Sequence, residues 1–266
     1  MRLKQQLPLF DHNLDEAPAF TPEALVEAVR LRRGGEVGAV PPVCVLDFDG
    51  DLTDHLVRRS IAHKFDGWAC FHTDMFAVEV DGAHCGVIPR TIGGPYAVLI
   101  AEQLIASGAQ VVIGLTSAGR VSRTIPIPSL VIATSALRDE GTSHHYLPPS
   151  ATVEAPREIA AILAKEVAAV GLPVSTGLVW TTDAPYRETL SQLKKHARAG
   201  ALAVEMQAAS LFAFAVARNA AVGIVAHVTN AVDHDGEAFD KGAEVDEELL
   251  FRSMCRAGLL VRMQTP

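Results

Sequence analysis

Short runs of apolar residues alternate along the chain with longer segments in which apolar positions recur every three or four residues. The short runs are typical of buried strands, and the longer segments are typical of amphipathic helices. We expect strands at residues 43–46, 75–80, 85–88, 110–115, 129–133, 174–180, 201–204 and 222–228. We expect helices that start near residue 21 and span residues 97–105, 154–170, 188–198, 207–218 and 244–260. This alternation predicts an α/β fold, a single domain with a mixed central β-sheet flanked by helices, with ligands bound beyond the carboxyl ends of its strands.

The first twenty residues follow neither pattern. Pro8, Pro18 and scattered acidic residues interrupt them, and a helical pattern begins only at Thr21 and Pro22. A chain of 266 residues is long enough to bury one large core. We therefore expect an N-terminal arm over residues 1–20 and one domain over residues 21–266.

Charge and cysteine content narrow the classes of partner. The chain carries 23 Lys and Arg against 31 Asp and Glu, a formal net charge of −8, without a basic run, which argues against nucleic acid as a partner. No apolar stretch reaches the ~20 residues of a membrane span. The four cysteines form no C-x-x-C pair and follow no secretory leader. We expect a cytoplasmic protein with reduced thiols and no membrane partner.

An acidic motif follows the strand expected at residues 43–46. Asp47, Asp49 and Gly50 resemble the D-x-D-G start of haloacid dehalogenase-type phosphatases, in which the carboxylates serve as nucleophile, acid/base and magnesium ligands. Asp51 stands where that family has Thr. A turn whose carboxylates accept hydrogen bonds from nearby backbone amides explains the motif equally well. A magnesium phosphatase that uses Asp47 and Asp49 therefore stays as an alternative of another class.

Several further motifs occur in the order that one known fold requires. Together they resemble the nucleoside phosphorylase and uridine phosphorylase superfamily, which includes purine and uridine phosphorylases and methylthioadenosine nucleosidases. The motifs are residues 92–97 (IGGPYA), 112–119 (VIGLTSAG), 130–133 (LVIA), 136–146 (ALRDEGTSHHY), 182–188 (TDAPYRE) and 203–209 (AVEMQAA). The resemblance runs from about residue 43 to the C-terminus and implies cleavage of the N-glycosidic bond of a purine or pyrimidine nucleoside.

The chemistry of that reaction matches the residues of one motif. Breaking an N-ribosidic bond builds positive charge on the sugar, so the site needs hydrogen-bond acceptors around the ribose. Glu205, Met206 and Gln207 offer a carboxylate, an apolar thioether and an amide, and the resemblance implies that they bind ribose with His144. The family commonly has Glu at the position of Gln207. Taken alone, Met206 is equally well explained as core filler and Glu205 as a helix-start charge.

The base would be held by two other segments. The resemblance places Tyr186 and Arg187 in the base pocket and Asn230, after the last strand, in contact with the base as a catalytic residue. Asp233 is a nearby substitute acid. The alternatives are a turn-capping role for Asn230 and a surface ion pair of Arg187 with a neighbouring glutamate.

The phosphate site departs from the family. Gly50, Ser117 and Gly119 are the candidate phosphate-binding residues, but Asp54 and Gly114 stand where the family has arginines. We therefore expect phosphorolysis by a pentosyltransferase first, hydrolysis by a nucleosidase second, and nucleoside binding without catalysis third.

The remaining expectations concern cofactors and assembly. We expect no cofactor other than inorganic phosphate as co-substrate. We expect no metal, because His144 and His145 lack the spacing of further ligands. The resemblance also implies a homo-oligomer, which can be a dimer, trimer or hexamer.

Overall fold

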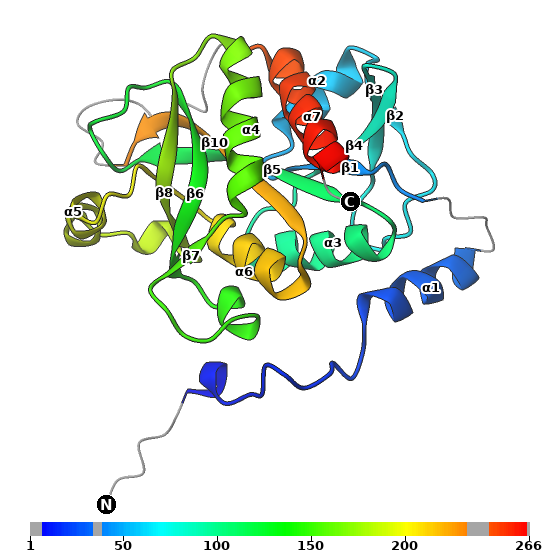
Figure 1. Cartoon of the computed structure of the whole chain (residues 1–266), viewed down its shortest axis with the longest axis horizontal. Helices are drawn as coiled ribbons and strands as arrows, with labels where there is room; N and C mark the ends of the chain where they lie inside the picture. The colour runs from blue at the N-terminus through cyan, green and yellow to red at the C-terminus, as the bar shows by residue number, and fades with distance from the viewer. Residues whose placement is uncertain (1–6, 34–38, 233–244, 265–266) are drawn as a thin grey trace, which may run out of the picture.

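The computed structural model describes residues 7–33, 39–232 and 245–264, and its central feature is one curved mixed sheet covered by helices (Figure 1). The strands are β1 (Val43–Asp47), β2 (His63–Lys64), β3 (Phe76–Val80), β4 (Ala83–Pro89), β5 (Val111–Arg120), β6 (Ser129–Asp139), β7 (Thr152–Glu154), β8 (Val174–Thr182), β9 (Ala203–Glu205) and β10 (Ala221–Ala231). The α-helices are α1 (Pro22–Arg33), α2 (Asp51–Arg58), α3 (Gly94–Ala106), α4 (Arg157–Val167), α5 (Leu190–Arg198), α6 (Ala208–Arg218) and α7 (Glu247–Gln264). The short 3-10 turns are η1 (Pro8–Phe10), η2 (Thr142–His145), η3 (Ala168–Val170) and η4 (Pro185–Arg187).

Strand β5 belongs to two parts of the sheet at once. Its first half pairs in parallel with β1, which continues through β4 to β3 and β2. It also pairs in parallel along its length with β10, and its last two residues pair antiparallel with β9. Because β10 pairs with β6, β6 with β8 and β8 with β9, the sheet closes on itself through β5, β10, β6, β8 and β9.

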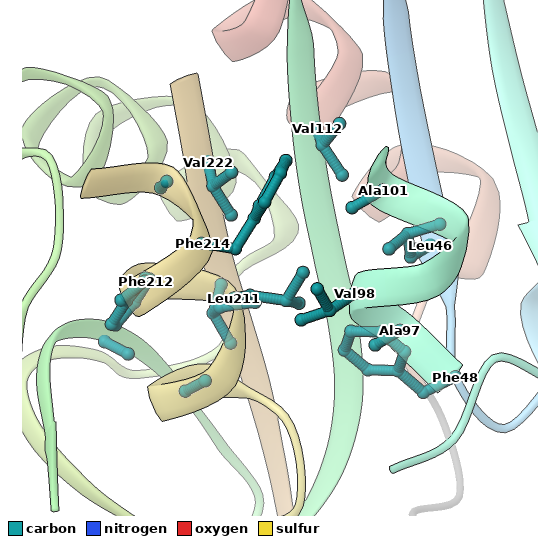
Figure 2. Close-up of a cluster of buried hydrophobic side chains, with 14 of the residues drawn as sticks. Leu46, Phe48, Ala97, Val98, Ala101, Val112, Leu211, Phe212, Phe214 and Val222 are labelled. Carbon is teal, nitrogen blue, oxygen red and sulfur yellow. The ribbon is translucent and has the colours of Figure 1, made fainter. Parts of the chain in front are cut away.

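Helices bury both faces of this sheet, which is why its strands are almost continuously apolar. Helices α3 and α6 cover one face, where their side chains meet those of β1, β5 and β10 (Figure 2). Helices α2, α4 and α7 cover the other face. In β1 the alternation is complete: Cys44 and Leu46 lie on the α3 side, and Val43 and Val45 on the α7 side.

The expected fold class is confirmed, and most expected elements are present with shifted ends. The hairpin of β3 and β4 turns at Asp81 and Gly82, which both have positive φ angles, 51° and 79°. Strands β5 and β6 run several residues beyond their expected ends. The helix expected at residues 154–170 is divided into the end of β7, α4 and η3. Helix α2 was missed because it starts within the acidic motif, which was interpreted as a loop.

The N-terminal arm lies along the body and leads into α1 (Figure 1). The ring of His12 stacks on that of His145 with 4.9 Å between centroids, and Phe10 meets His144 edge-on at 5.1 Å. Val26 and Val29 of α1 pack against Ala69. A cavity of about 820 Å³ remains between the arm and helices α3 and α6.

Among the described residues, none of the helices combines the length and the apolar composition that crossing a membrane requires.

The buried position of α6 predicts a large difference between two nearby substitutions. Phe214 is fully buried in the α3 side core, whereas Val216 is 54% exposed on the same helix. We expect Phe214→Ala to lower the free energy of unfolding by about 3–5 kcal/mol, because it leaves a cavity that the core cannot fill. Val216→Ala should change it by less than about 0.5 kcal/mol. Urea denaturation followed by circular dichroism measures both, and equal effects would contradict the core position of α6.

Candidate active site

A cavity of about 420 Å³ lies where the carboxyl ends of β5 and β10 meet the start of α6. Ligand sites in α/β folds lie at such strand ends. Its walls come from four parts of the chain: the β5 end, the β9–α6 junction, the segment around η4, and the end of β10. The lining residues are Asp49, Ile92, Thr116, Ser117, Ala118, Gly119, Pro185, Tyr186, Glu188, Leu190, Leu193, Val204, Glu205, Met206, Gln207, Asn230 and Val232.

Glu205 ends β9 and caps α6. One carboxylate oxygen accepts hydrogen bonds from the backbone amides of Gln207 at 2.6 Å and Ala208 at 2.8 Å. The other oxygen accepts a hydrogen bond from the Thr181 hydroxyl at 2.5 Å, and that hydroxyl accepts one from the Ala209 amide at 2.9 Å. Burial raises the pKa of Glu205 to about 7, although these hydrogen bonds act in the opposite direction. Glu205 therefore holds the start of α6 and also lines the cavity.

Gln207 connects the β9–α6 junction to β5. Its side-chain oxygen accepts hydrogen bonds from the Thr116 hydroxyl at 3.3 Å and from the Met206 amide at 3.2 Å. Gln207 and Thr116 are buried, and Met206 is partly exposed. The β9–α6 junction therefore presents the thioether of Met206 and the amide of Gln207 to the cavity. Hydrogen bonds to Glu205 and Thr116 hold this junction in place.

A bulge in β10 determines the position of Asn230. The pairing of β10 with β5 shifts register between Val228 and Asn230, so that Asn230 lies opposite Gly119. Bulges redirect side chains and are common next to active sites. The Asn230 side-chain oxygen accepts a hydrogen bond from the Thr229 hydroxyl at 3.3 Å. The side chain remains partly exposed at the cavity wall.

The segment around η4 forms a mainly apolar wall. Tyr186 is fully exposed but lines the cavity, whereas Arg187 is exposed and does not line it. Glu188 follows η4, is partly buried and lines the cavity. Desolvation by burial raises the pKa of Glu188 to about 7.

The acidic motif serves two different structural purposes. Asp47 accepts hydrogen bonds from the Gly50 amide at 3.0 Å, from the Thr53 amide at 2.7 Å and from the Thr53 hydroxyl at 2.8 Å. It thereby anchors the first turn of α2, which confirms the capping interpretation for this residue. Burial raises the pKa of Asp47 to about 6 against the lowering effect of these bonds.

Asp49 points the other way, toward β5. Its carboxylate accepts a hydrogen bond from the backbone amide of Ser117 at 2.9 Å and lines the cavity. A second cavity of about 260 Å³ adjoins on the other side, and Asp49, Thr116 and Ser117 line both. His227 lines this second cavity, and its burial lowers the pKa of the imidazole.

Neither family position for a phosphate-binding arginine offers a cation. Asp54 forms an ion pair with Arg90 at 2.5 Å. A Cβ atom on Gly114 would lie 2.6 Å from the Phe48 ring, so the buried phenyl group occupies the direction in which a longer side chain would extend.

The sequence matches the family model described as the phosphorylase superfamily over residues 42–257. The chain belongs to the phosphorylase superfamily. Purine nucleoside phosphorylase from Toxoplasma gondii, solved in complex with immucillin-H, aligns with a TM-score of 0.73 and 19% identity, covering 85% of this chain and 93% of that one. This likeness shows the shared fold.

Individual superfamily relatives are distant. Uridine phosphorylase from Thermococcus kodakarensis is 32% identical over 105 residues, which are 40% of this chain and 38% of that protein. Guanosine phosphorylase from Halorubrum lacusprofundi is 28% identical over 171 residues, 64% of this chain and 69% of that protein. An uncharacterised protein of Acanthamoeba polyphaga mimivirus is 29% identical over 157 residues, 56% of this chain and 58% of that protein. Less than two thirds of the mimivirus protein and of the uridine phosphorylase is covered.

The phosphatase alternative has no support, because the chain belongs to another superfamily and the carboxylates of Asp47 and Asp49 accept hydrogen bonds from different segments, α2 and β5. Most of the expected site residues converge on one cavity, and five members of the lining are Ser117, Gly119, Glu205, Met206 and Gln207. Tyr186 and Asn230 line it too.

Other expected site residues lie elsewhere. Gly50 and Arg187 do not line the cavity. His144 lies beside the N-terminal arm, where its ring nitrogen is 3.1 Å from Arg138 and its carbonyl oxygen is 3.1 Å from the ring of His12. Asp233 lies outside the described residues.

Two polar members of the lining, Thr116 and Glu188, were not among the expected site residues, and Asp49 was expected only in the phosphatase alternative. Thr116 is adjacent to the expected Ser117, and Glu188 was considered only as an ion-pair partner of Arg187. Asp49 was noticed as a phosphatase carboxylate. The usable signal for Asp49 was its place directly after the buried strand β1, because ligand sites in α/β folds lie at such strand ends.

The buried carboxylate of Glu205 predicts a pH-dependent contribution to stability. Its pKa rises from 4.5 to about 7 in the folded chain, so the folded state binds a proton that the unfolded state has lost between these values. The resulting cost is absent below about pH 4.5 and complete above about pH 7, with an upper limit of about 3 kcal/mol.

Glu205→Gln removes this titration while an amide oxygen still accepts the bonds of Gln207 and Ala208. We expect the stability of the unsubstituted protein, relative to Glu205→Gln, to fall as pH rises from 5 to 8. Chemical denaturation at several pH values measures this difference, and a difference that is constant with pH would contradict the burial of an ionisable carboxyl at this position.

Proposed function

We propose that this chain cleaves the N-glycosidic bond of a nucleoside and that water, in preference to phosphate, accepts the ribosyl group. We favour water as the acceptor because the Asp49 carboxylate accepts a hydrogen bond from the Ser117 amide, which a phosphate would otherwise occupy. Phosphorolysis, the reaction first expected from the sequence, is the alternative for the same site.

The cavity supports nucleoside binding through the distribution of its side chains. Polar groups gather where β5 meets the β9–α6 junction, and apolar side chains gather around η4 and α5. We assign the polar end to the ribose, with Met206 along the sugar and Gln207 and Glu205 at its hydroxyls. We assign the apolar end, with Tyr186 and Asn230, to the base. A volume of about 420 Å³ lies in the range of small-molecule sites.

The acceptor end favours water because the carboxylate of Asp49 already occupies the Ser117 amide. A phosphate bound at the Ser117 amide would have to displace the carboxylate of Asp49, which already accepts that hydrogen bond. Two like charges about 4 Å apart near a protein surface repel each other by about 4 kcal/mol. Asp51, the first residue of α2, lines the adjoining cavity together with Arg58, and Arg90 is paired with Asp54.

Water is neutral and avoids this repulsion, and the carboxylate of Asp49 can take part in its reaction. As the C1′–N bond stretches, positive charge grows on the sugar, and the carboxylate of Asp49 stabilises it. Asp49 then removes a proton from the attacking water, in the manner of a general base. His144, His145 and the arm have no part in this step.

The test is the release of free base from a panel of purine and pyrimidine nucleosides, with and without inorganic phosphate. We expect release without phosphate and no more than a small change when phosphate is added. Release only with phosphate would establish phosphorolysis. Saturable binding without release would contradict both enzymatic functions and leave a nucleoside-binding protein.

A matched pair of variants tests the role of Asp49. Asp49→Asn should lower kcat by about 10²–10⁴-fold, because the amide keeps the shape but cannot accept the proton of water. Asp54→Asn is the control, since Asp54 is an exposed partner of Arg90 and lines neither cavity. Its kcat should remain within about twofold, as expected for loss of a surface ion pair. Equal losses in the two variants would contradict the assignment.

A further inference from the structure

We propose that Gln207 turns a hydrogen-bond donor toward the sugar and that the site therefore selects 2′-deoxyribonucleosides over ribonucleosides. The inference rests on the proposed function, because it concerns the nucleoside that the same cavity holds. It assigns to Gln207 a role in specificity and to the substrate a class of sugar.

The backbone amide of Met206 fixes the orientation of the Gln207 side chain. It donates a hydrogen bond to Gln207 Oε1 with 3.2 Å between the two atoms. A backbone amide can only donate, so the oxygen of the side-chain amide must face it; the turned-over group would place two donors against each other. The Thr116 hydroxyl approaches the same oxygen at 3.3 Å. The oxygen of Gln207 is therefore occupied by groups of the protein itself.

The nitrogen of the same side chain is left for a ligand. Gln207 is 1% exposed and lines the cavity. Its Nε2 atom carries two protons and makes no hydrogen bond to any residue in the part of the chain that the structure describes. Buried donors need acceptors, and here the molecule in the cavity has to provide them. A glutamate at this position would instead turn a second acceptor oxygen toward the cavity.

Glu205 has little capacity left to compensate. Its Oε2 atom accepts the backbone amides of Gln207 at 2.6 Å and Ala208 at 2.8 Å, which use both lone pairs of that oxygen. Its Oε1 atom accepts the Thr181 hydroxyl at 2.5 Å. The β9–α6 junction therefore offers a sugar the two protons of Gln207 and a single remaining lone pair of Glu205.

This balance of donors and acceptors discriminates between sugars. Ribose carries adjacent 2′- and 3′-hydroxyl groups, whose oxygens accept from Gln207 but whose two protons both need acceptors. The other carboxylates of the lining, Asp49 and Glu188, belong to different walls, after β1 and after η4. A 2′-deoxyribose has only the 3′-hydroxyl of this pair, and the junction satisfies it fully. The 2′-hydroxyl of a ribonucleoside would bury a proton without an acceptor, which costs binding free energy.

The experiment compares nucleosides that differ only at C2′. We expect kcat/KM to favour 2′-deoxyinosine over inosine and 2′-deoxyuridine over uridine in the unsubstituted protein. In Gln207→Glu this ratio should fall by about tenfold or more, because a carboxylate oxygen then accepts the 2′-hydroxyl proton. The intrinsic reactivity of the two sugars is the same with both proteins, so the change in the ratio reports on residue 207 alone.

Gln192→Glu is the matched control. It makes the same chemical change on α5, outside the cavity lining, at the third position of a capping box that a glutamate also completes. Its ratio should equal that of the unsubstituted protein. An unchanged ratio in Gln207→Glu, or a change of the same size in Gln192→Glu, would overturn the role of Gln207 while hydrolysis stands.

Binding to the unsubstituted protein gives a second test, which needs no variant and no cleavage. Fluorine at C2′ accepts weakly and cannot donate, so 2′-deoxy-2′-fluorouridine should bind within about threefold of 2′-deoxyuridine, and uridine about tenfold more weakly. Isothermal titration calorimetry measures these Kd values, and the adenosine series repeats the test with a purine. Uridine and adenosine that bind as tightly as their 2′-deoxy forms would overturn the inference. If the protein neither cleaves nor binds any of these nucleosides, the proposed function fails with it.

Discussion

The pairing of β5 with both β10 and β9 is the constraint on which the rest of the structure depends. A parallel strand at this place would otherwise end at an open sheet edge. By closing the sheet through β6 and β8, β5 brings residues from widely separated parts of the chain to one point, where Gly119 lies opposite Asn230 and pairs with Val204. The candidate site exists only because this closure joins the ends of β5, β9 and β10.

Three carboxylates, of which Asp47 and Glu205 are buried and Asp49 is partly exposed, then fix the chain around that point. Asp47 holds the start of α2, Glu205 holds the start of α6, and Asp49 joins the acidic loop to β5. Each accepts backbone amide hydrogen bonds, which take the place of a cation partner. Loops that are held through backbone amides keep their geometry when nearby side chains change. The superfamily fold is therefore compatible with Asp54 and Gly114 at the positions expected for arginines.

The fold was predictable from the sequence because its strands are buried on both faces. The apolar runs at β1, β5 and β10 predicted these strands without any information on their partners. The closure of the sheet was not predictable, because β5 and β9 pair through only two residue pairs, Gly119 with Val204 and Arg120 with Ala203, whose members lie far apart in the sequence. The ordered motifs contain Met206, Gln207 and Ser117, which line one cavity, but the place of Glu188 in that lining and the contact of Asp49 with β5 required the folded chain.

The packing of Phe48 against Gly114 limits how this protein can change over evolutionary time. An arginine introduced at position 114 would collide with a buried ring, and a smaller residue at position 48 alone would leave a void beside a glycine. Each single step toward a cationic acceptor site therefore passes through a destabilised intermediate. The charge of the site is therefore tied to the packing of the core beneath it, and a cation at position 114 requires coordinated replacements there.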